Sequence, residues 1–320
     1  MYRGKTIAVV IPCFNEELLI ERVLRTMPGF VDTLIVVDDN STDSTAAIVE
    51  HCASDFGERL VLLRHRRNRG VGAALVSGYR QSRKLGRDVT VVMNGDAQMD
   101  PLDLPALLDP IVSGRADYSK GNRLFGGRAW EQIPHVRYMG NAVLSLFTKI
   151  ASGYWHVADS QSGYTAITLQ ALKTLRLNHV YKDYGVPNDL LVRLNVENFR
   201  VQDVPVKPIY NIGEKSGIRY RKVIPRISWL LLRLFFWRLQ EKYIIRDFHP
   251  LVFFYFFGLT LLPVGLLLGF YLLWLRIHYG PAPVTFTSAL FACLLIISGL
   301  QFLFFAMWFD MERNKELKCL

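Results

Sequence analysis

Cysteine is scarce in this sequence, and the cysteines that occur are far apart. None of the four among 320 residues belongs to a C-x-x-C pair, so neither a disulfide framework nor a zinc site is indicated. They are Cys13, Cys52, Cys293 and Cys319. A signal peptide is also not indicated, because the N-terminal apolar run Ile7–Ile11 is short and meets Pro12 and polar residues. We therefore expect a reducing, cytosolic location for the part of the chain outside a membrane.

Charge is missing from two long stretches near the C-terminus. Leu251–Leu275 has 25 residues and Val284–Phe309 has 26, and neither contains a charged side chain. About 20 apolar residues span a bilayer as a helix, and the short connector contains the helix breakers Gly280, Pro281 and Pro283. The sequence predicts a transmembrane hairpin over about residues 251–275 and 284–309. A buried hairpin of a soluble protein is the alternative.

Acidic residues are nearly absent from the segment before the first stretch. Between residues 215 and 246, nine basic residues stand against Glu241 alone. They are Lys215, Arg219, Arg221, Lys222, Arg226, Arg233, Arg238, Lys242 and Arg246. Such clusters attract anionic lipid headgroups. A nucleic-acid-binding patch is the alternative, but a nearby membrane already explains the positive charge, so no nucleic-acid partner is expected. Basic residues also follow the second stretch, whereas the connector has only Arg276. The positive-inside rule then predicts a multi-pass protein of the cytoplasmic (inner) membrane, with its N-terminal domain and C-terminus in the cytoplasm.

Within this basic segment, apolar and basic residues alternate at helical spacing from Val223 to Ile245. This pattern indicates an amphipathic helix that lies in the headgroup plane. A helix that packs on the domain itself is the alternative. The predicted domains are a globular N-terminal domain (1–215), juxtamembrane helices (216–247), and the hairpin with a short cytoplasmic tail (248–320).

Short apolar runs rich in β-branched residues alternate with helical patterns in the first domain. The runs are Ile7–Ile11, Leu34–Val37, Leu60–Leu63 and Val89–Met93, and the helical patterns are Glu17–Met27, Ser44–Cys52 and Val71–Lys84. This alternation predicts an α/β fold with a mostly parallel sheet. Ligands of such sheets bind beyond the carboxyl ends of the strands. Because a polar cluster follows each run, we expect a binding site at that edge.

Two of these clusters are acidic. Asp38 and Asp39 follow the second run, and Asn94, Asp96 and Gln98 follow the fourth. Carboxylate and amide oxygens suit Mg²⁺ or Mn²⁺, which take their remaining ligands from water and substrate phosphates. We therefore predict Asp96, Gln98 and Asn94 as metal ligands. The alternatives are a helix cap at Asp38–Asp39 and a turn at Asn94-Gly95.

Six motifs occur in a fixed order over residues 5 to 215. They are Ile11–Glu17, Val37–Asp43, Asn68–Gly70 with Gly72–Ala74, Asn94–Gln98, Gly121–Arg123 and Asp159–Tyr164. This series resembles the inverting glycosyltransferase family 2, close to the dolichol-phosphate-mannose-synthase-like enzymes. The resemblance implies a Rossmann-like GT-A fold and a nucleotide-sugar donor. Appended membrane helices also occur in the branch of this family that acts on polyprenyl phosphates.

The resemblance also implies roles for individual residues. The expected nucleotide-sugar-binding residues are Pro12, Phe14, Asn15, Glu16, Asp38, Asp39, Asn68, Gly70, Asn94 and Gly95. Arg123 and Arg137 are expected to bind the acceptor phosphate, and Asp96, Asp159 and Asp189 are the candidate catalytic carboxylates. Alternatives stay open: the arginines brace loops, Asp159 forms a turn, and Asp189 caps a helix.

Two positions depart from the family pattern. Asn94 replaces the first acid of the Asp-x-Asp metal motif, which leaves Asp96 as the main anionic ligand. The arginine expected after the last strand has no clear counterpart, and Lys215, Arg219 or Arg221 are the candidate substitutes.

The sequence thus predicts inverting transfer of a hexose from a UDP- or GDP-sugar to a polyprenyl (undecaprenyl or dolichyl) phosphate. The nucleotide, the sugar and the polyprenol length stay open. A processive polysaccharide synthase is an alternative, but the chain has no Gln-x-x-Arg-Trp sequence and two helices cannot enclose a pore. A catalytically inactive sugar-nucleotide-binding scaffold is another, because of Asn94. Homo-oligomers formed through the hairpin are implied by the resemblance alone.

Overall fold

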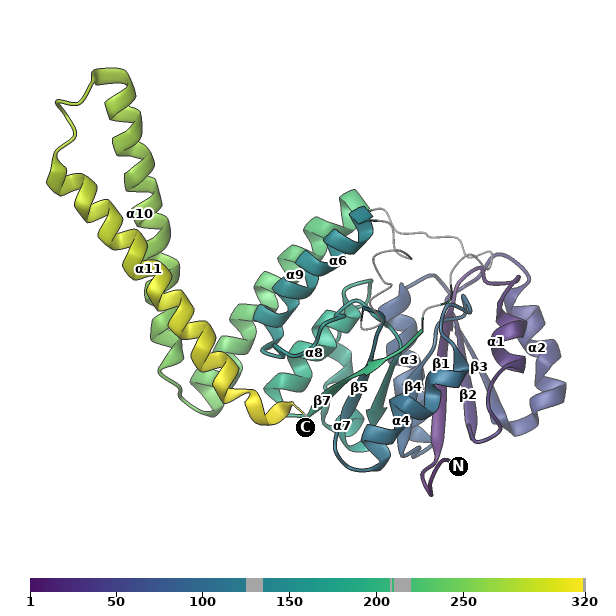
Figure 1. Ribbon diagram of the computed structural model, residues 1–320. Coiled ribbons are helices and arrows are strands. Elements are labelled where there is room, and N and C mark those ends of the chain that lie inside the picture. The colour runs from purple at the N-terminus through teal and green to yellow at the C-terminus, as the bar shows by residue number, and fades with distance from the viewer. Residues whose placement is uncertain (125–134, 208, 210–219, 319–320) are drawn as a thin grey trace. The chain divides into compact units, whose positions relative to one another are not determined.

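The computed structural model describes residues 1–124, 135–207, 209 and 220–318, with the backbone alone for 135–139, 141 and 220–222 (Figure 1). The chain forms two compact units, one of Met1–Phe235 with Glu316–Leu320 and one of Phe236–Lys315. The predicted domain boundary at residue 215 lies outside the described residues, and the boundary at residue 247 stays a prediction.

The first unit is built on a seven-stranded sheet in the order β3-β2-β1-β4-β6-β5-β7. The strands are β1 (Ile7–Cys13), β2 (Thr33–Asp38), β3 (Leu60–Arg64), β4 (Val89–Val92), β5 (Tyr118–Asn122), β6 (Thr165–Thr168) and β7 (Val201–Pro205). Strands β1 to β4 pair in parallel, as do β5 and β7, whereas β6 is antiparallel to β4 and β5. The predicted mostly parallel α/β sheet is confirmed.

Helices cover both faces of this sheet because successive side chains of a buried strand point to opposite faces. Ile7, Val9 and Ile11 of β1 belong to one core, and Ala8 and Val10 belong to the other. The first core includes side chains of α1 (Ile20–Arg25), α2 (Thr45–Phe56) and α4 (Leu104–Val112). The second includes side chains of α3 (Val71–Lys84), α7 (Leu169–Thr174) and α8 (Val186–Val196), so the unit has three layers (Figure 1).

All four predicted strands are present, and their carboxyl ends lie at one edge of the sheet, as parallel pairing requires. The first helix begins at Ile20, three residues later than predicted. The late start has a tertiary cause: the backbone N–H of Glu17 donates to Asp43, and the Glu17 carboxylate accepts from the N–H of Ser44. These bonds hold residue 17 in a loop.

The predicted amphipathic helix is α9 (Tyr220–Gln240), and a π-helical turn, Glu241–Arg246, follows it. Its apolar side packs within the first unit, where a Cβ on Gly185 would lie 2.5 Å from Leu230 Cδ2. Packing on the domain, the alternative interpretation, is therefore observed for this side. Trp229 and Arg233 lie on the exposed side.

One further long helix is α6 (His135–Ser152). The other helical elements are the 3-10 turns Gly57–Arg59, Pro101–Asp103, Leu177–His179 and Lys315–Leu317.

The second unit contains the predicted hairpin, formed by α10 (Leu251–Tyr279) and α11 (Phe286–Arg313). Helix α10 continues past the predicted connector residue Arg276 and ends before Gly280, whose φ of 80° suits glycine. Both helices are long and apolar enough to cross a membrane. Leu267 and Phe304 are 70% and 66% exposed. A buried soluble hairpin would hide such side chains, so membrane association is indicated.

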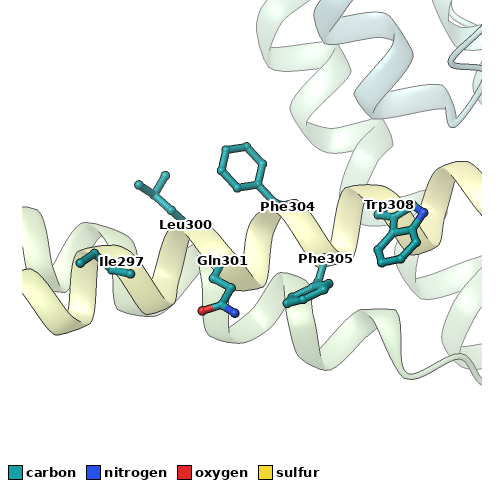
Figure 2. A pocket seen from close by; sticks show the side chains of 6 residues that line it. All are labelled: Ile297, Leu300, Gln301, Phe304, Phe305 and Trp308. Carbon is teal, nitrogen blue, oxygen red and sulfur yellow. The ribbon is translucent and has the colours of Figure 1, made fainter.

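Small residues let the two helices approach closely. A Cβ on Gly265 would lie 2.8 Å from the backbone N of Ile296, and one on Gly299 would lie 2.5 Å from that of Leu262. A different face of α11 is hollowed. Figure 2 shows the side chains that line the hollow: Ile297, Leu300, Gln301, Phe304, Phe305 and Trp308. With one polar side chain among six, this face suits contact with lipid chains.

A buried ion pair ties the end of α9 to α11 within the second unit. Arg238 and Asp310 are fully buried and share two hydrogen bonds of 2.8 and 3.0 Å. Tyr243 donates a third hydrogen bond to Asp310 at 2.7 Å. Removing one partner of such a pair leaves an unpaired buried charge, which is strongly destabilising.

Candidate active site

The loops that follow β1 and β2 are bonded to each other at the carboxyl edge of the sheet. The side-chain oxygen of Asn15, whose φ is 58°, accepts a hydrogen bond from the backbone N–H of Thr42 at 2.8 Å. The backbone N–H of Glu16 donates to the Thr45 hydroxyl at 2.8 Å. These paired loops and the strand ends before them contain six of the predicted nucleotide-sugar-binding residues: Pro12, Phe14, Asn15, Glu16, Asp38 and Asp39.

Asp38 presents a carboxylate oxygen that the described residues do not fill. The side chain is 1% exposed, and its Oδ1 accepts a hydrogen bond from the backbone N–H of Ser41 at 3.0 Å. Its Oδ2 is buried without a hydrogen-bond donor among the described residues and lies 3.7 Å from Nε of Arg64. Buried polar atoms normally have a partner. This oxygen therefore suits a hydroxyl or N–H group of a ligand.

The carboxylate of Asp39, in contrast, is hydrogen-bonded to the loop that precedes α3. Its carboxylate accepts hydrogen bonds from the backbone N–H groups of Arg69 and Gly70 at 2.9 and 2.7 Å. Nδ1 of His65 lies 2.6 Å from Asp39 Oδ1, and Nε2 of His65 lies 2.9 Å from the Ser77 hydroxyl. Asp39 thus anchors a loop, and its direct contact with a nucleotide stays a prediction. His65 was not among the predicted site residues. Its position directly after the third strand is the feature of the sequence that could have indicated it.

The glycines of the third motif allow a close backbone approach. Gly70 has a φ of 88°, and a Cβ there would lie 2.6 Å from the carbonyl oxygen of Lys182. A Cβ on Gly72 would lie 2.4 Å from the carbonyl oxygen of Tyr181. The side-chain oxygen of Asn68 accepts a hydrogen bond from the N–H of Gly70 at 3.2 Å. These contacts place the segment before α8 against the start of α3.

The three predicted metal ligands lie in one turn after β4. Asn94, Asp96 and Gln98 are half-buried, and they alternate with the buried residues Gly95 and Ala97. The backbone N–H of Gln98 donates to Asp96 Oδ1 at 3.2 Å, and Ala97 has a φ of 55°. Within the described part of the chain, no group of three or more His, Cys, Asp or Glu residues is placed to hold a metal alone.

Glu16 adds a second carboxylate near Asp96. Burial, together with the negative charges of Asp96 and Asp43, raises the pKa of Glu16 to about 7. Gly95 packs closely on the end of β1, since a Cβ there would lie 3.0 Å from Cys13 Cβ. Two neighbouring carboxylates whose charges repel each other, beside amide oxygens, fit the ligand preference of Mg²⁺ and Mn²⁺.

Glu16→Gln is expected to remove a pH-dependent loss of stability. Because the folded-state pKa of Glu16 is raised, ionisation favours the unfolded chain, and stability falls as pH rises from about 4.5 to about 7. In metal-free detergent, the Tm of the variant minus that of the wild type should grow by about 2–4 °C between pH 5 and pH 8. This corresponds to roughly 1 kcal/mol, because solvent screens much of the effect at a half-exposed carboxylate. The exposed Glu58→Gln is the control. An equal difference at both pH values would contradict the expectation.

Arg123 and Asp159, predicted separately, form one ion pair. Nε of Arg123 donates to Asp159 Oδ2 at 2.7 Å, and Nη2 donates to Oδ1 at 3.1 Å. The backbone N–H of Arg123 also donates to Oδ2, at 3.2 Å. Burial acts to raise the pKa of Asp159, but the charge and hydrogen bonds of Arg123 outweigh burial and lower it. Asp159 is therefore an ionised, paired carboxylate at neutral pH.

Asp189 has partners of its own. It lies in the first turn of α8, is 1% exposed, and accepts hydrogen bonds of 2.8 Å from the Tyr181 N–H and from Nε of Arg193. The N-cap of α8 is Gly185, so Asp189 does not occupy the cap position. Arg137 lies in α6, but its side chain is outside the described residues. The side chains of the candidate substitutes Lys215, Arg219 and Arg221 are also outside them.

Lys120 is a further buried charge that the sequence analysis missed. It lies on β5 with 0% exposure, and its ammonium donates to the carbonyl oxygen of Ser162, within the motif that contains Asp159. The feature of the sequence that could have indicated it is a lysine inside a strand, directly before the Gly121–Arg123 motif.

The chain is similar to known proteins over much of its first unit. Residues 8–176 match the family model described as Glycosyl transferase family 2. The UDP-N-acetylglucosamine–dolichyl-phosphate N-acetylglucosaminyltransferase of Methanococcus voltae is 30% identical over 218 residues, which cover 64% of this chain and 86% of the relative. The polyprenol monophosphomannose synthase of Mycolicibacterium smegmatis is 29% identical over 228 residues, 69% of this chain and 84% of the relative.

A solved structure shares the fold. It is glucosyl-3-phosphoglycerate synthase from Mycobacterium tuberculosis in complex with Mn²⁺, UDP-glucose and phosphoglyceric acid. Its TM-score is 0.51 at 25% identity, and the match covers 73% of this chain and 80% of that one. With the sheet order and the motif-bearing edge described above, the chain belongs to glycosyl transferase family 2 and is a glycosyltransferase with a GT-A-like fold.

Proposed function

We propose that this chain transfers a hexose from a nucleotide sugar to a polyprenyl phosphate, with inversion at the anomeric carbon, at the cytoplasmic face of a membrane. The relatives named for dolichyl-phosphate and polyprenol-phosphate chemistry support this class of acceptor. The two apolar helices support a membrane location.

The observation that favours a phosphate acceptor is the pairing of the candidate bases. A hydroxyl acceptor needs a base within reach that takes its proton. Asp159 is held by Arg123 with a lowered pKa, and Asp189 is held by Arg193 and a backbone N–H. Because both carboxylates are already paired, neither is arranged to take a proton from a hydroxyl acceptor. A phosphate monoester, whose second pKa is near about 6, already presents an anionic oxygen at neutral pH.

Arg123 is the described residue best suited to that phosphate. Its side chain is 19% exposed, and Asp159 fixes its guanidinium through two hydrogen bonds. A planar guanidinium suits charge-assisted, potentially bidentate contacts with a phosphate. A phosphate oxygen then attacks the anomeric carbon while the bond to the nucleoside diphosphate breaks on the opposite face. Arg137 is proposed as a second phosphate ligand.

The donor is proposed to bind along the loops after β1, β2 and β4. Asp38 offers its buried Oδ2, and Asp96 with Asn94 and Gln98 would hold a Mg²⁺ or Mn²⁺ ion. When bound, the cation neutralises charge on the departing diphosphate. The oxygen donors and the neighbouring Glu16 carboxylate fit such an ion.

A transfer assay tests this function. Purified protein in detergent is given undecaprenyl phosphate and a panel of labelled UDP- and GDP-sugars, with and without Mn²⁺. We expect labelled lipid from one donor, dependent on the cation. Undecaprenol, which has no phosphate, and 3-phosphoglycerate, which has no lipid, are the matched acceptors. Transfer to either of these but not to the lipid phosphate would refute the proposal, and binding without any transfer would favour an inactive scaffold.

A further inference from the structure

Lys120 is unusual because a lysine is almost never fully buried unless it is paired. Its side chain is 0% exposed, and its ammonium donates to the carbonyl oxygen of Ser162. Burial lowers the pKa of Lys120 to about 8, and the negative charges of Asp159 and Asp203 oppose that shift. Burial of this ammonium therefore lowers the stability of the fold, which an apolar side chain at the same position would not do.

The sheet register explains which charges surround Lys120. Lys120 on β5 is the register partner of Asp203 on β7, so the two side chains lie side by side on one face. Asp203 Oδ2 accepts hydrogen bonds from the Ala158 N–H at 2.7 Å and from Nδ2 of Asn122 at 3.1 Å. Burial raises the pKa of Asp203 to about 6. Asp203 thus ties β7 to the residue that precedes Asp159.

The result is a buried group of two cations and two carboxylates: Lys120, Arg123, Asp159 and Asp203. Lys120 and Asp159 are 0% and 1% exposed, while the Arg123 side chain is 19% exposed. Arg123 contacts Asp159 through its guanidinium and its backbone N–H. Any displacement of Asp159 therefore changes where the guanidinium points.

We propose that Lys120 is a positioning residue for sugar transfer, which holds the Asp159–Ser162 turn and, through Asp159, orients Arg123 toward the acceptor phosphate. This inference rests on the proposed function. Lys120 contacts the turn at its end, through the Ser162 carbonyl, and balances the charge of Asp159 at its start. Without the ammonium, the buried group has an excess negative charge beside Arg123, which draws the guanidinium inward and away from a phosphate.

Lys120→Met tests this role because methionine has a similar length and no charge. We expect the KM for undecaprenyl phosphate to rise about tenfold or more, while the KM for the active nucleotide sugar changes less than about twofold. In an Arg123→Ala background, the same substitution should change the acceptor KM less than about twofold, since residues that act through one another are not additive. Lys173→Met, at an exposed lysine of α7, is the matched control and should change neither KM.

Lys120→Gln replaces Lys120→Met if the latter does not fold, because glutamine keeps a donor for the Ser162 carbonyl. An unchanged acceptor KM, an equal rise in both KM values, or additivity with Arg123→Ala would overturn the positioning role. In each of these cases the wild type still transfers the sugar to undecaprenyl phosphate, so the proposed function stands while the positioning role fails. If the wild type does not transfer to undecaprenyl phosphate, the proposed function and this inference both fail.

Discussion

Asp96→Ala is expected to reduce sugar transfer by about a hundredfold to a thousandfold while the protein stays folded and membrane-bound. Asn94 replaces the first acid of the motif, so Asp96 is the one carboxylate in the turn after β4. Losing it removes the main anionic ligand for a cation that stabilises the leaving diphosphate, and electrostatic terms of this kind are worth about 10²–10³ in kcat for a single group. Asp96 is half-buried on a loop, so its removal leaves no large cavity.

The measurement is the initial rate of transfer in detergent, with the Tm as a check on folding. Asp100→Ala is the matched control, because Asp100 lies four residues away and its side chain caps a short 3-10 helix. We expect it to reduce the rate only a few-fold. If Asp96→Ala keeps near-normal activity, the assignment of the metal to this turn is wrong.

Short apolar runs and polar strand ends made the sheet edge predictable. The runs of β1, β2 and β4 are buried and rich in β-branched residues, while the apolar run of β3 is half-buried at the side of the sheet. Parallel pairing of such runs brings their carboxyl ends together whatever the loop contacts are. The hairpin was predictable for a related reason, since its length without charge exceeds what a soluble helix needs. The late start of α1 was not, because it depends on hydrogen bonds between residues about 26 positions apart.

The partners of individual site residues were beyond sequence reasoning. Asp38 and Asp39 are adjacent and chemically identical, yet one keeps a buried oxygen without a donor and the other is filled by the loop before α3. Asp159 and Arg123 are 36 residues apart, and Lys120 meets the Ser162 carbonyl across 42. Such pairs depend on strand order, in particular on β6 between β4 and β5, which no local pattern specifies.

Arg123→Ala should raise the KM for undecaprenyl phosphate by roughly 10- to 100-fold, with a much smaller effect on the donor KM. A hydrogen bond to a charged group contributes about 1.5–3 kcal/mol, and Arg123 is expected to donate to the acceptor phosphate while Asp159 holds it. Arg123→Lys keeps the charge but loses the planar fork, so we expect an intermediate acceptor KM.

One complication of Arg123→Ala has a direct remedy. The substitution leaves the 1% exposed Asp159 without its main partner, and an unpaired buried charge costs about 3–5 kcal/mol. The double variant Arg123→Ala/Asp159→Asn removes that charge, so it should recover Tm relative to Arg123→Ala without recovering the acceptor KM. Recovery of both would show that Arg123 acts only as a brace for the Asp159 turn. A donor KM that rises more than the acceptor KM would instead place Arg123 on the nucleotide side of the reaction.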